Sequence, residues 1–105
     1  MQVLVTGATG FIGRHVVRAL VDAGHAARCL VRPTSDRSGL AEAGVTFAVG
    51  DVGAPDTLGP AVEGVDAVIH LASLLKAPWK RAFHTVNVEG TRNLAAACAA
   101  QAEPP

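Results

Sequence analysis

Short apolar runs alternate with longer amphipathic segments along the chain. The apolar runs are rich in β-branched residues, which is typical of buried strands, and they cover residues 2–6, 27–31, 45–49 and 67–71. After the first run, apolar residues recur at helical spacing over residues 11–23, and Gly24 supplies a stop signal. A polar connection with one helical turn near residues 40–43 joins the second run to the third. The pattern therefore predicts strands that alternate with helices.

Two more helices are expected in the second half of the chain. One covers residues 55–63, where Pro55 suits the first helical position and Gly59 and Pro60 should shorten or kink the helix. The other covers residues 81–100 and ends in an alanine-rich stretch of high helix propensity. The element order is then βαβαβαβα, which implies an α/β fold with a parallel sheet and right-handed crossovers.

The last residues of the chain indicate an incomplete sheet. Glu103, Pro104 and Pro105 stand where a loop into a fifth strand is expected, so the fourth strand would be left as a bare apolar edge. We therefore expect residues 1–105 to be the N-terminal portion of a larger domain. This portion would hold the first four βα units, without the remainder of the domain and the substrate region.

Composition narrows the functional classes. With 105 residues, of which 50% are hydrophobic, the chain can build one ordinary globular core. Nine basic residues balance nine acidic ones, so no overall field attracts nucleic acid or an anionic membrane. The longest nearly apolar stretch, residues 67–75, is far shorter than the roughly 20 residues that cross a bilayer. Cys29 and Cys98 have apolar neighbours and form no Cys/His cluster, which favours reduced thiols in a cytoplasmic protein without a metal site.

The turn between the first strand and the first helix carries the clearest chemistry. It reads TGATGFIG from Thr6 onward, with Gly7, Gly10 and Gly13 spaced three residues apart. Glycines so placed allow a tight turn, bring the backbone close to phosphate and let the helix pack closely on the strand. Free amides at the helix start, with the helix dipole behind them, then face a pyrophosphate. The turn predicts a dinucleotide site, with a purely structural turn as the alternative. A P-loop is excluded because no Gly-Lys-Ser/Thr follows.

The end of the second strand bears on the choice of dinucleotide. An acidic residue about 20 positions beyond the glycines would accept the ribose hydroxyls of NAD. Val31 and Arg32 stand there instead, and a guanidinium can hold the 2′-phosphate of NADP through two hydrogen bonds. Arg14 and Arg37 are placed to assist. The sequence therefore favours NADP over NAD, with a simple strand-end role for Arg32 as the alternative.

Further candidates follow the third and fourth strands, at the carboxyl edge of the sheet where open α/β folds bind ligands. Asp51 either accepts a hydrogen bond from the adenine amino group or caps the following loop. His70 invites an acid/base role, but its apolar strand favours a buried, hydrogen-bonded structural histidine. Leu71, Ala72 and Ser73 come next, where the phosphate and the nicotinamide ribose of the cofactor would pass.

Four motifs along the chain resemble those of one enzyme family. They are TGATGFIG at residues 6–13, GDV at 50–52, HLAS at 70–73 and NVEGT at 87–91. In this order and at this spacing they resemble the extended or atypical short-chain dehydrogenase/reductases, in particular the NAD(P)-dependent sugar epimerase/dehydratase-like proteins. The resemblance implies a Rossmann-type three-layer fold, of which the chain matches the N-terminal part.

The resemblance also implies cofactor contacts. These are the diphosphate turn with Thr9, Phe11 and Ile12, the adenine contacts Asp51 and Val52, and the nicotinamide side with Leu71, Ala72 and Ser73. Asn87 is similar to the family asparagine near the cofactor pocket, with a helix-start hydrogen bond as an equally good interpretation. A homodimer through the last helix is also implied.

Catalysis in the family depends on a Tyr-x-x-x-Lys pair with a nearby Ser or Thr, and this chain contains no tyrosine. No catalytic residue is therefore assigned, and the 105 residues alone are expected to be inactive. The whole protein is expected to act as an oxidoreductase or epimerase/dehydratase on a small hydroxyl or carbonyl substrate such as a nucleotide sugar. Because fold does not fix function, a non-catalytic dinucleotide-binding sensor or scaffold subunit stays open.

Overall fold

The computed structural model describes residues 1–40, 44–72, 81 and 84–105. The elements are β1 (Gln2–Thr6), α1 (Phe11–Asp22), β2 (Ala26–Val31), β3 (Val45–Val49), η1 (Pro55–Thr57), α2 (Leu58–Val62), β4 (Ala67–His70), η2 (His84–Glu89) and α4 (Gly90–Ala99). All four predicted strands are present, with ends that differ from the prediction by at most one residue.

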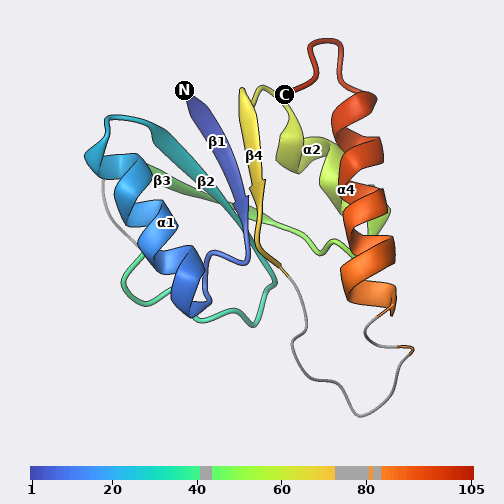
Figure 1. Ribbon diagram of the computed structural model, residues 1–105, viewed down its shortest axis with the longest axis horizontal. Helices are drawn as coiled ribbons and strands as arrows, with labels where there is room; N and C mark the ends of the chain where they lie inside the picture. Colours follow the sequence, from blue (N-terminus) through green and yellow to red (C-terminus); the bar gives the residue numbers. More distant parts are fainter. Residues whose placement is uncertain (41–43, 73–80, 82–83) are drawn as a thin grey trace.

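The four strands form one parallel sheet in the order β3-β2-β1-β4. From β1 the chain winds through β2 to β3 on one side, and then crosses back to add β4 on the other side of β1 (Figure 1). The direction of winding therefore reverses between β1 and β4. In open α/β sheets, the carboxyl ends of the strands at such a reversal form the ligand-binding crevice. The predicted α/β fold with a parallel sheet is confirmed.

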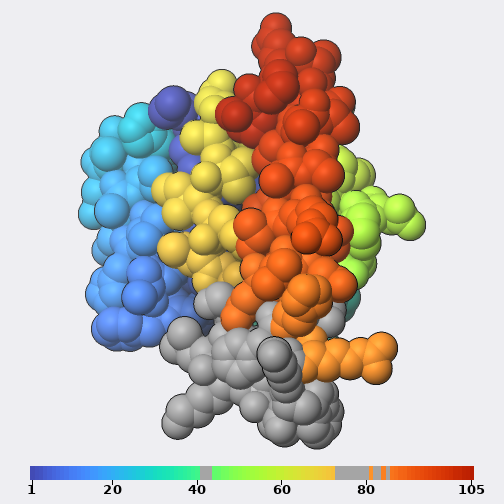
Figure 2. Space-filling model, turned by 45° about the vertical axis from the view of Figure 1, so that its right-hand side comes forward, coloured from blue at the N-terminus to red at the C-terminus, as the bar shows by residue number. Residues whose placement is uncertain are grey.

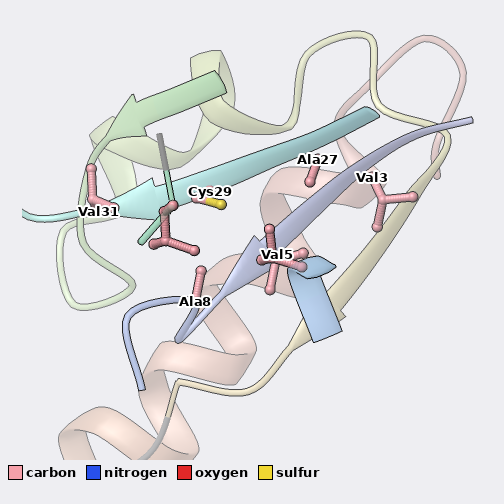
Figure 3. Packing of buried hydrophobic residues seen from close by; sticks show 8 residues of the cluster. Val3, Val5, Ala8, Ala27, Cys29 and Val31 are labelled. Atoms are coloured by element: carbon pink, nitrogen blue, oxygen red, sulfur yellow. The ribbon is translucent and has the colours of Figure 1, made fainter. Parts of the chain in front are cut away.

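Helices cover both faces of the sheet (Figure 1). Successive residues of a strand point to opposite faces, so each face has its own apolar cluster. The face covered by α1 holds the cluster Val3, Val5, Ala8, Val17, Ala27, Cys29, Val31 and Leu40 (Figure 3). The face covered by α2 and α4 holds the cluster Leu4, Leu30, Val52, Leu58, Ala61, Val62, Val65 and Leu94. Figure 1 shows the resulting three layers, with α1 on one side of the strands and α2 and α4 on the other.

The helices depart from the prediction more than the strands do. The segment predicted as one helix over residues 55–63 is a short 3-10 turn, η1, followed by α2. Pro60 is the third residue of α2, so its missing N–H falls in the first turn, where no intrahelical partner exists. The helix predicted for residues 81–100 divides into a π-helical turn, η2, and α4. Val86 and Val88 in η2 have low helix propensity, which accounts for the irregular start.

The connection between β2 and β3 contains no helix among its described residues, so the regular alternation is interrupted there. The turn predicted near residues 40–43 lies outside the described residues except for Leu40.

At the other end of the sheet, β4 is an edge strand, as predicted. In Figure 2 it reaches the surface between α1 and α4. Within the described ranges, the helices are all too short or too polar to cross a bilayer.

One charged side chain on β2 fastens a helix to the sheet. The Nη1 atom of Arg28 donates hydrogen bonds to the carbonyl oxygens of Ala61 (2.8 Å) and Glu63 (2.7 Å). These carbonyls lie at the C-terminal end of α2, where helical carbonyl groups lack partners within the helix. A cation at this end is also favoured by the helix dipole. Arg28 therefore caps α2 from the neighbouring layer.

Replacing Arg28 by methionine keeps an unbranched apolar side chain and removes both hydrogen bonds. We expect Arg28→Met to lower the free energy of unfolding by about 1–2 kcal/mol, because two helix-end carbonyls lose a charged donor. Urea denaturation measures this change. Arg92→Met, on an exposed position of α4, is the matched control and should change the free energy by less than about 0.5 kcal/mol. Equal stability of the two variants would contradict the capping role.

Candidate cofactor-binding site

The glycine-rich turn after β1 is closed by backbone contacts that exclude side chains. Gly7 has a φ of +74°, in the left-handed region that favours glycine. A Cβ atom on Gly7 would lie 2.7 Å from the carbonyl carbon of Leu71, and one on Gly13 would lie 2.0 Å from the carbonyl oxygen of Gly7. Glycine at both positions lets the start of α1 and the segment after β4 meet the end of β1.

Gly10 differs from its two neighbours in the motif. It is the N-cap of α1, and a Cβ atom there would meet only the carbonyl oxygen of Gly7, at an ordinary contact distance of 3.4 Å. No described side chain caps the amides of the first turn of α1, and that turn contains no acidic residue. Phe11 and Ile12, which begin the helix, are 81% and 65% exposed. The positive end of the α1 dipole is therefore open to a ligand anion.

The space available for a Cβ atom differs between Gly13 and Gly10, so alanine at the two positions should affect stability differently. Gly13→Ala should lower the free energy of unfolding by about 2–4 kcal/mol, because the new methyl group overlaps backbone atoms that cannot move independently. The control is Gly10→Ala, where the Cβ position has room, which should change the free energy by less than about 1 kcal/mol. Thermal or urea unfolding compares the two. A Gly13→Ala protein as stable as the Gly10→Ala protein would refute the close approach.

A hollow of about 340 Å³ lies beside the glycine-rich turn, at the carboxyl ends of β2 and β3. Thr9 lines it from the turn, Arg32 and Ser35 from the loop after β2, and Asp51 and Val52 from the loop after β3. The sequence predicted all of these except Ser35. The Ser35 hydroxyl accepts a hydrogen bond from the Arg32 backbone N–H at 2.9 Å, which holds the two residues in one tight turn.

The Asp51 side chain shapes its own loop. Its Oδ1 atom accepts a hydrogen bond from the Gly53 N–H at 2.8 Å, and its backbone N–H donates to the Thr57 hydroxyl at 3.0 Å. The loop-capping alternative is thus realised, and the carboxylate also lines the hollow. Val52 is buried, and its carbonyl accepts a hydrogen bond from the side-chain amide of Asn93 at 2.9 Å, which ties the loop to α4.

Arg14 and Arg37 do not assist Arg32, contrary to the expectation from the sequence. The Arg14 guanidinium donates to the carbonyl oxygens of Thr9 (3.1 Å) and Asp36 (3.0 Å), so it links the glycine-rich turn to the loop after β2. The Arg37 guanidinium lies over the Phe47 ring, 4.9 Å from its centroid. Neither residue lines the hollow. Both are engaged by partners outside their own segments, which sequence spacing does not show.

A second hollow, of about 660 Å³, continues from the first along the carboxyl edge of the sheet. The two hollows share Gly7, Gly10, Leu71 and Ala72. The second is further lined by Phe11, Ile12, Gly13, His70, Asn87 and Thr91. One groove therefore passes over the point where the sheet reverses its winding. It brings together the candidate residues predicted from the sequence except Arg14 and Arg37, which do not line it, and Ser73, which lies outside the described residues.

His70 is hydrogen-bonded through both ring nitrogens. Its Nδ1 atom lies 2.6 Å from the Thr6 hydroxyl and its Nε2 atom 3.0 Å from the Thr91 hydroxyl. Burial lowers the pKa of His70. This geometry agrees with the structural interpretation of His70. Neither Thr6 nor Thr91 was predicted to have a role, although a polar residue that ends an apolar strand is a signal that could have singled out Thr6.

The fold is that of Rossmann-type epimerases and dehydrogenases. Residues 3–104 match the profile of the NAD dependent epimerase/dehydratase family. The chain belongs to this family.

Three similar proteins illustrate its range. The chain is 44% identical over 94 residues to the photosystem II assembly factor Ycf39 of Synechocystis sp., covering 90% of this chain and 28% of that protein. It is 43% identical over 100 residues to the ceramide reductase of Caulobacter vibrioides, covering 95% and 31%. The crystal structure of the UDP-glucose 4-epimerase of Thermus thermophilus in complex with NAD matches with a TM-score of 0.80 and 30% identity, covering 93% and 33%. The chain thus spans about a third of the length of these proteins or less.

Proposed function

We propose that residues 1–105 form the NAD(P)-binding part of an oxidoreductase or epimerase/dehydratase that acts on a small hydroxyl or carbonyl substrate. A nucleotide sugar is one substrate class within this proposal. The observation that carries it is the open N-terminus of α1, which faces a continuous groove at the reversal point of the sheet.

The residues of the groove fit a dinucleotide. Backbone amides at the start of α1 have no capping side chain among the described residues, and Gly10 leaves room for a phosphate to approach them. The hollow with Arg32, Asp51 and Val52 would hold the adenosine half, and the hollow with Asn87 and the segment after β4 would hold the nicotinamide half. A bound nicotinamide ring would supply hydride transfer.

The whole protein would have to supply two things, residues that bind the cofactor and residues that transfer a proton. The described residues of the groove bind and orient, and none of them is proposed as a catalytic residue. Because the chain contains no tyrosine, the family's Tyr-x-x-x-Lys pair would have to be supplied from outside these 105 residues. We therefore propose that the chain binds the cofactor without turnover.

The preference for NADP rests on Arg32. Its side chain is exposed, lines the first hollow, and has no hydrogen-bond or ion-pair partner within the described part of the chain. The hydroxyl of Ser35 lines the same hollow. A guanidinium beside a hydroxyl suits the additional phosphate of NADP better than the free ribose hydroxyls of NAD.

Separate calorimetric titrations with NADPH and with NADH test this preference. NADPH should bind more tightly than NADH, and Arg32→Ala should weaken NADPH binding by about tenfold while NADH binding changes by less than about twofold. Arg37→Ala is the control, because that guanidinium lies over Phe47 and outside the hollow. Tighter binding of NADH by the unaltered protein would exclude a role for Arg32 in selecting NADP.

Gly10→Val separates ligand binding from folding. The Cβ position has room, and the extended backbone of the N-cap (φ −78°, ψ 174°) accepts a branched residue, so the free energy of unfolding should change by less than about 1 kcal/mol. The added methyl groups would occupy the space of the pyrophosphate, so binding of both dinucleotides should be lost. Undiminished binding by a folded Gly10→Val protein would refute the proposed pose.

A non-catalytic dinucleotide-binding sensor or scaffold subunit is the second candidate. The observation in its favour is the 44% identity to a protein named an assembly factor. A Tyr-x-x-x-Lys pair in the protein that carries this chain, together with turnover of NADPH, would support the enzyme. Cofactor binding without such a pair would support the sensor or scaffold.

The state of the two cysteines supports a proposal about the cellular compartment of the protein. Both cysteines are unpaired, Cys29 is buried, and burial raises the pKa of its thiol to about 11, which keeps it protonated and unreactive. This suits a reducing compartment, so we propose that the protein lies in the cytoplasm.

The family resemblance supports a homodimer through α4, which light scattering after gel filtration would test.

A further inference from the structure

The hydroxyl of Thr6 is the meeting point of three groups. Thr6 ends β1 with its side chain fully buried. Its Oγ1 atom accepts hydrogen bonds from the backbone N–H of Ala72 (3.2 Å) and from that of Leu71 (3.1 Å), which is shared with the Thr6 carbonyl oxygen (3.1 Å). A hydroxyl has two acceptor lone pairs and one hydrogen. With both lone pairs used, its hydrogen is left for the Nδ1 atom of His70 at 2.6 Å.

This arrangement fixes the tautomer of His70. Because Nδ1 accepts a hydrogen bond, the single proton of the neutral ring is on Nε2. Nε2 then donates to the Thr91 hydroxyl at 3.0 Å, and that hydroxyl donates to the backbone carbonyl of Asn87 at 2.9 Å. The hydrogen bonds thus run in one direction, from the segment after β4 through Thr6 and the imidazole to η2.

We propose that His70 is a positioning residue that fixes the two walls of the second hollow against each other, and that it does so only as the neutral, Nε2-protonated ring. One wall is the segment of Leu71 and Ala72, and the other contains Asn87. The importance of this hollow for cofactor binding rests on the proposed function. The hydrogen-bond direction rests on the geometry of the chain alone.

Protonation of His70 breaks the arrangement. A charged imidazole carries N–H groups on both nitrogens, so Nδ1 would present a hydrogen to an oxygen whose lone pairs are already taken. The hydroxyl hydrogen of Thr6 would lose its acceptor in a fully buried position. We expect the segment of Leu71 and Ala72 to separate from Thr6 when the ring becomes charged.

No described neighbour offers a compensating charge. The side chains that share the hollow with His70 are uncharged, and burial alone lowers its pKa. The titratable or charged side chains on the surrounding helical segments α1, η2 and α4 are Arg14, His15, Arg18, Asp22, His84, Glu89, Arg92 and Cys98. Of these, His84 and Glu89 pair with each other at 3.6 Å on the exposed side of η2.

The direction of the pH effect follows from the lowered pKa. The unfolded chain binds a proton at His70 near the ordinary histidine pKa of about 6.5, and the folded chain binds it only at lower pH. The contribution of His70 to stability is therefore complete above about pH 6.5, falls as the pH drops below that value, and is lost once the pH passes the lowered pKa.

NMR of the ¹⁵N-labelled protein tests the arrangement without any ligand. At neutral pH, His70 should show a protonated Nε2 and an acceptor-type Nδ1. On acidification it should titrate below the ordinary histidine pKa of about 6.5, and the amide signals of Leu71 and Ala72 should shift with the same midpoint. An Nδ1-protonated ring, or amide signals that do not follow its titration, would overturn the inference.

Two variants of Thr91 test the link to η2. Thr91 is exposed on α4, so its replacement spares the core. Thr91→Val should keep the tautomer, shift the Asn87 amide signal and weaken NADH binding by about three- to tenfold, through the loss of one hydrogen-bonded link. Thr91→Ser should restore both properties, and Thr46→Val, at an exposed position on β3, is the control. NADH is used because the additional phosphate of NADPH itself titrates near pH 6.

The outcomes of these experiments are distinct. Unchanged NADH affinity and an unchanged Asn87 signal in Thr91→Val would overturn the positioning role. Failure of the unaltered protein to bind NADH or NADPH would instead count against the proposed function, while the tautomer and the coupled amide shifts would still decide the inference about His70.

Discussion

The end of β1, the start of α1 and the segment after β4 are in close backbone contact, and the groove depends on this contact. Gly7 lies against the segment after β4, and Gly13 at the start of α1 lies against the Gly7 carbonyl oxygen, each too closely for a Cβ atom. This contact fixes the position of α1 relative to the reversal point of the sheet. The open amides of α1 then point into the groove without a side chain having to hold them there.

The two ends of the groove are built on different physical principles. At the end near β2, the exposed guanidinium of Arg32 lies in the same hollow as the Ser35 hydroxyl, so an anion there would be attracted by charge. At the end near β4, the walls are neutral, and His70 joins them through hydrogen bonds. Salt would screen the attraction of an anion to Arg32 at the first end. At the second end, protonation of His70 would disturb the hydrogen bonds that join the walls.

The sequence was sufficient for the features that local pattern determines. Strands in a sheet covered on both faces are mostly apolar, and turn positions that admit no Cβ atom must be glycine, so β1 to β4 and the glycine-rich turn were predictable. The division of the last helix and the true partners of Arg14 depend on contacts with other segments. The roles of Thr6 and Thr91 arise from contacts with His70, 64 and 21 positions away, so the local sequence could at most mark Thr6 as a polar residue at the end of an apolar strand.

The described part of the loop after β2 is joined to the glycine-rich turn through a side chain. Among the described contacts, the Arg14 guanidinium is the side-chain bridge between this loop and the glycine-rich turn, and it grips backbone carbonyls only. Carbonyl groups are present whatever residues the loop contains, so the bridge survives changes of loop sequence. If the groove binds a dinucleotide as proposed, its selectivity for one dinucleotide over another could therefore change in evolution or be redesigned in the laboratory, while the sheet and the glycine-rich turn stay as they are.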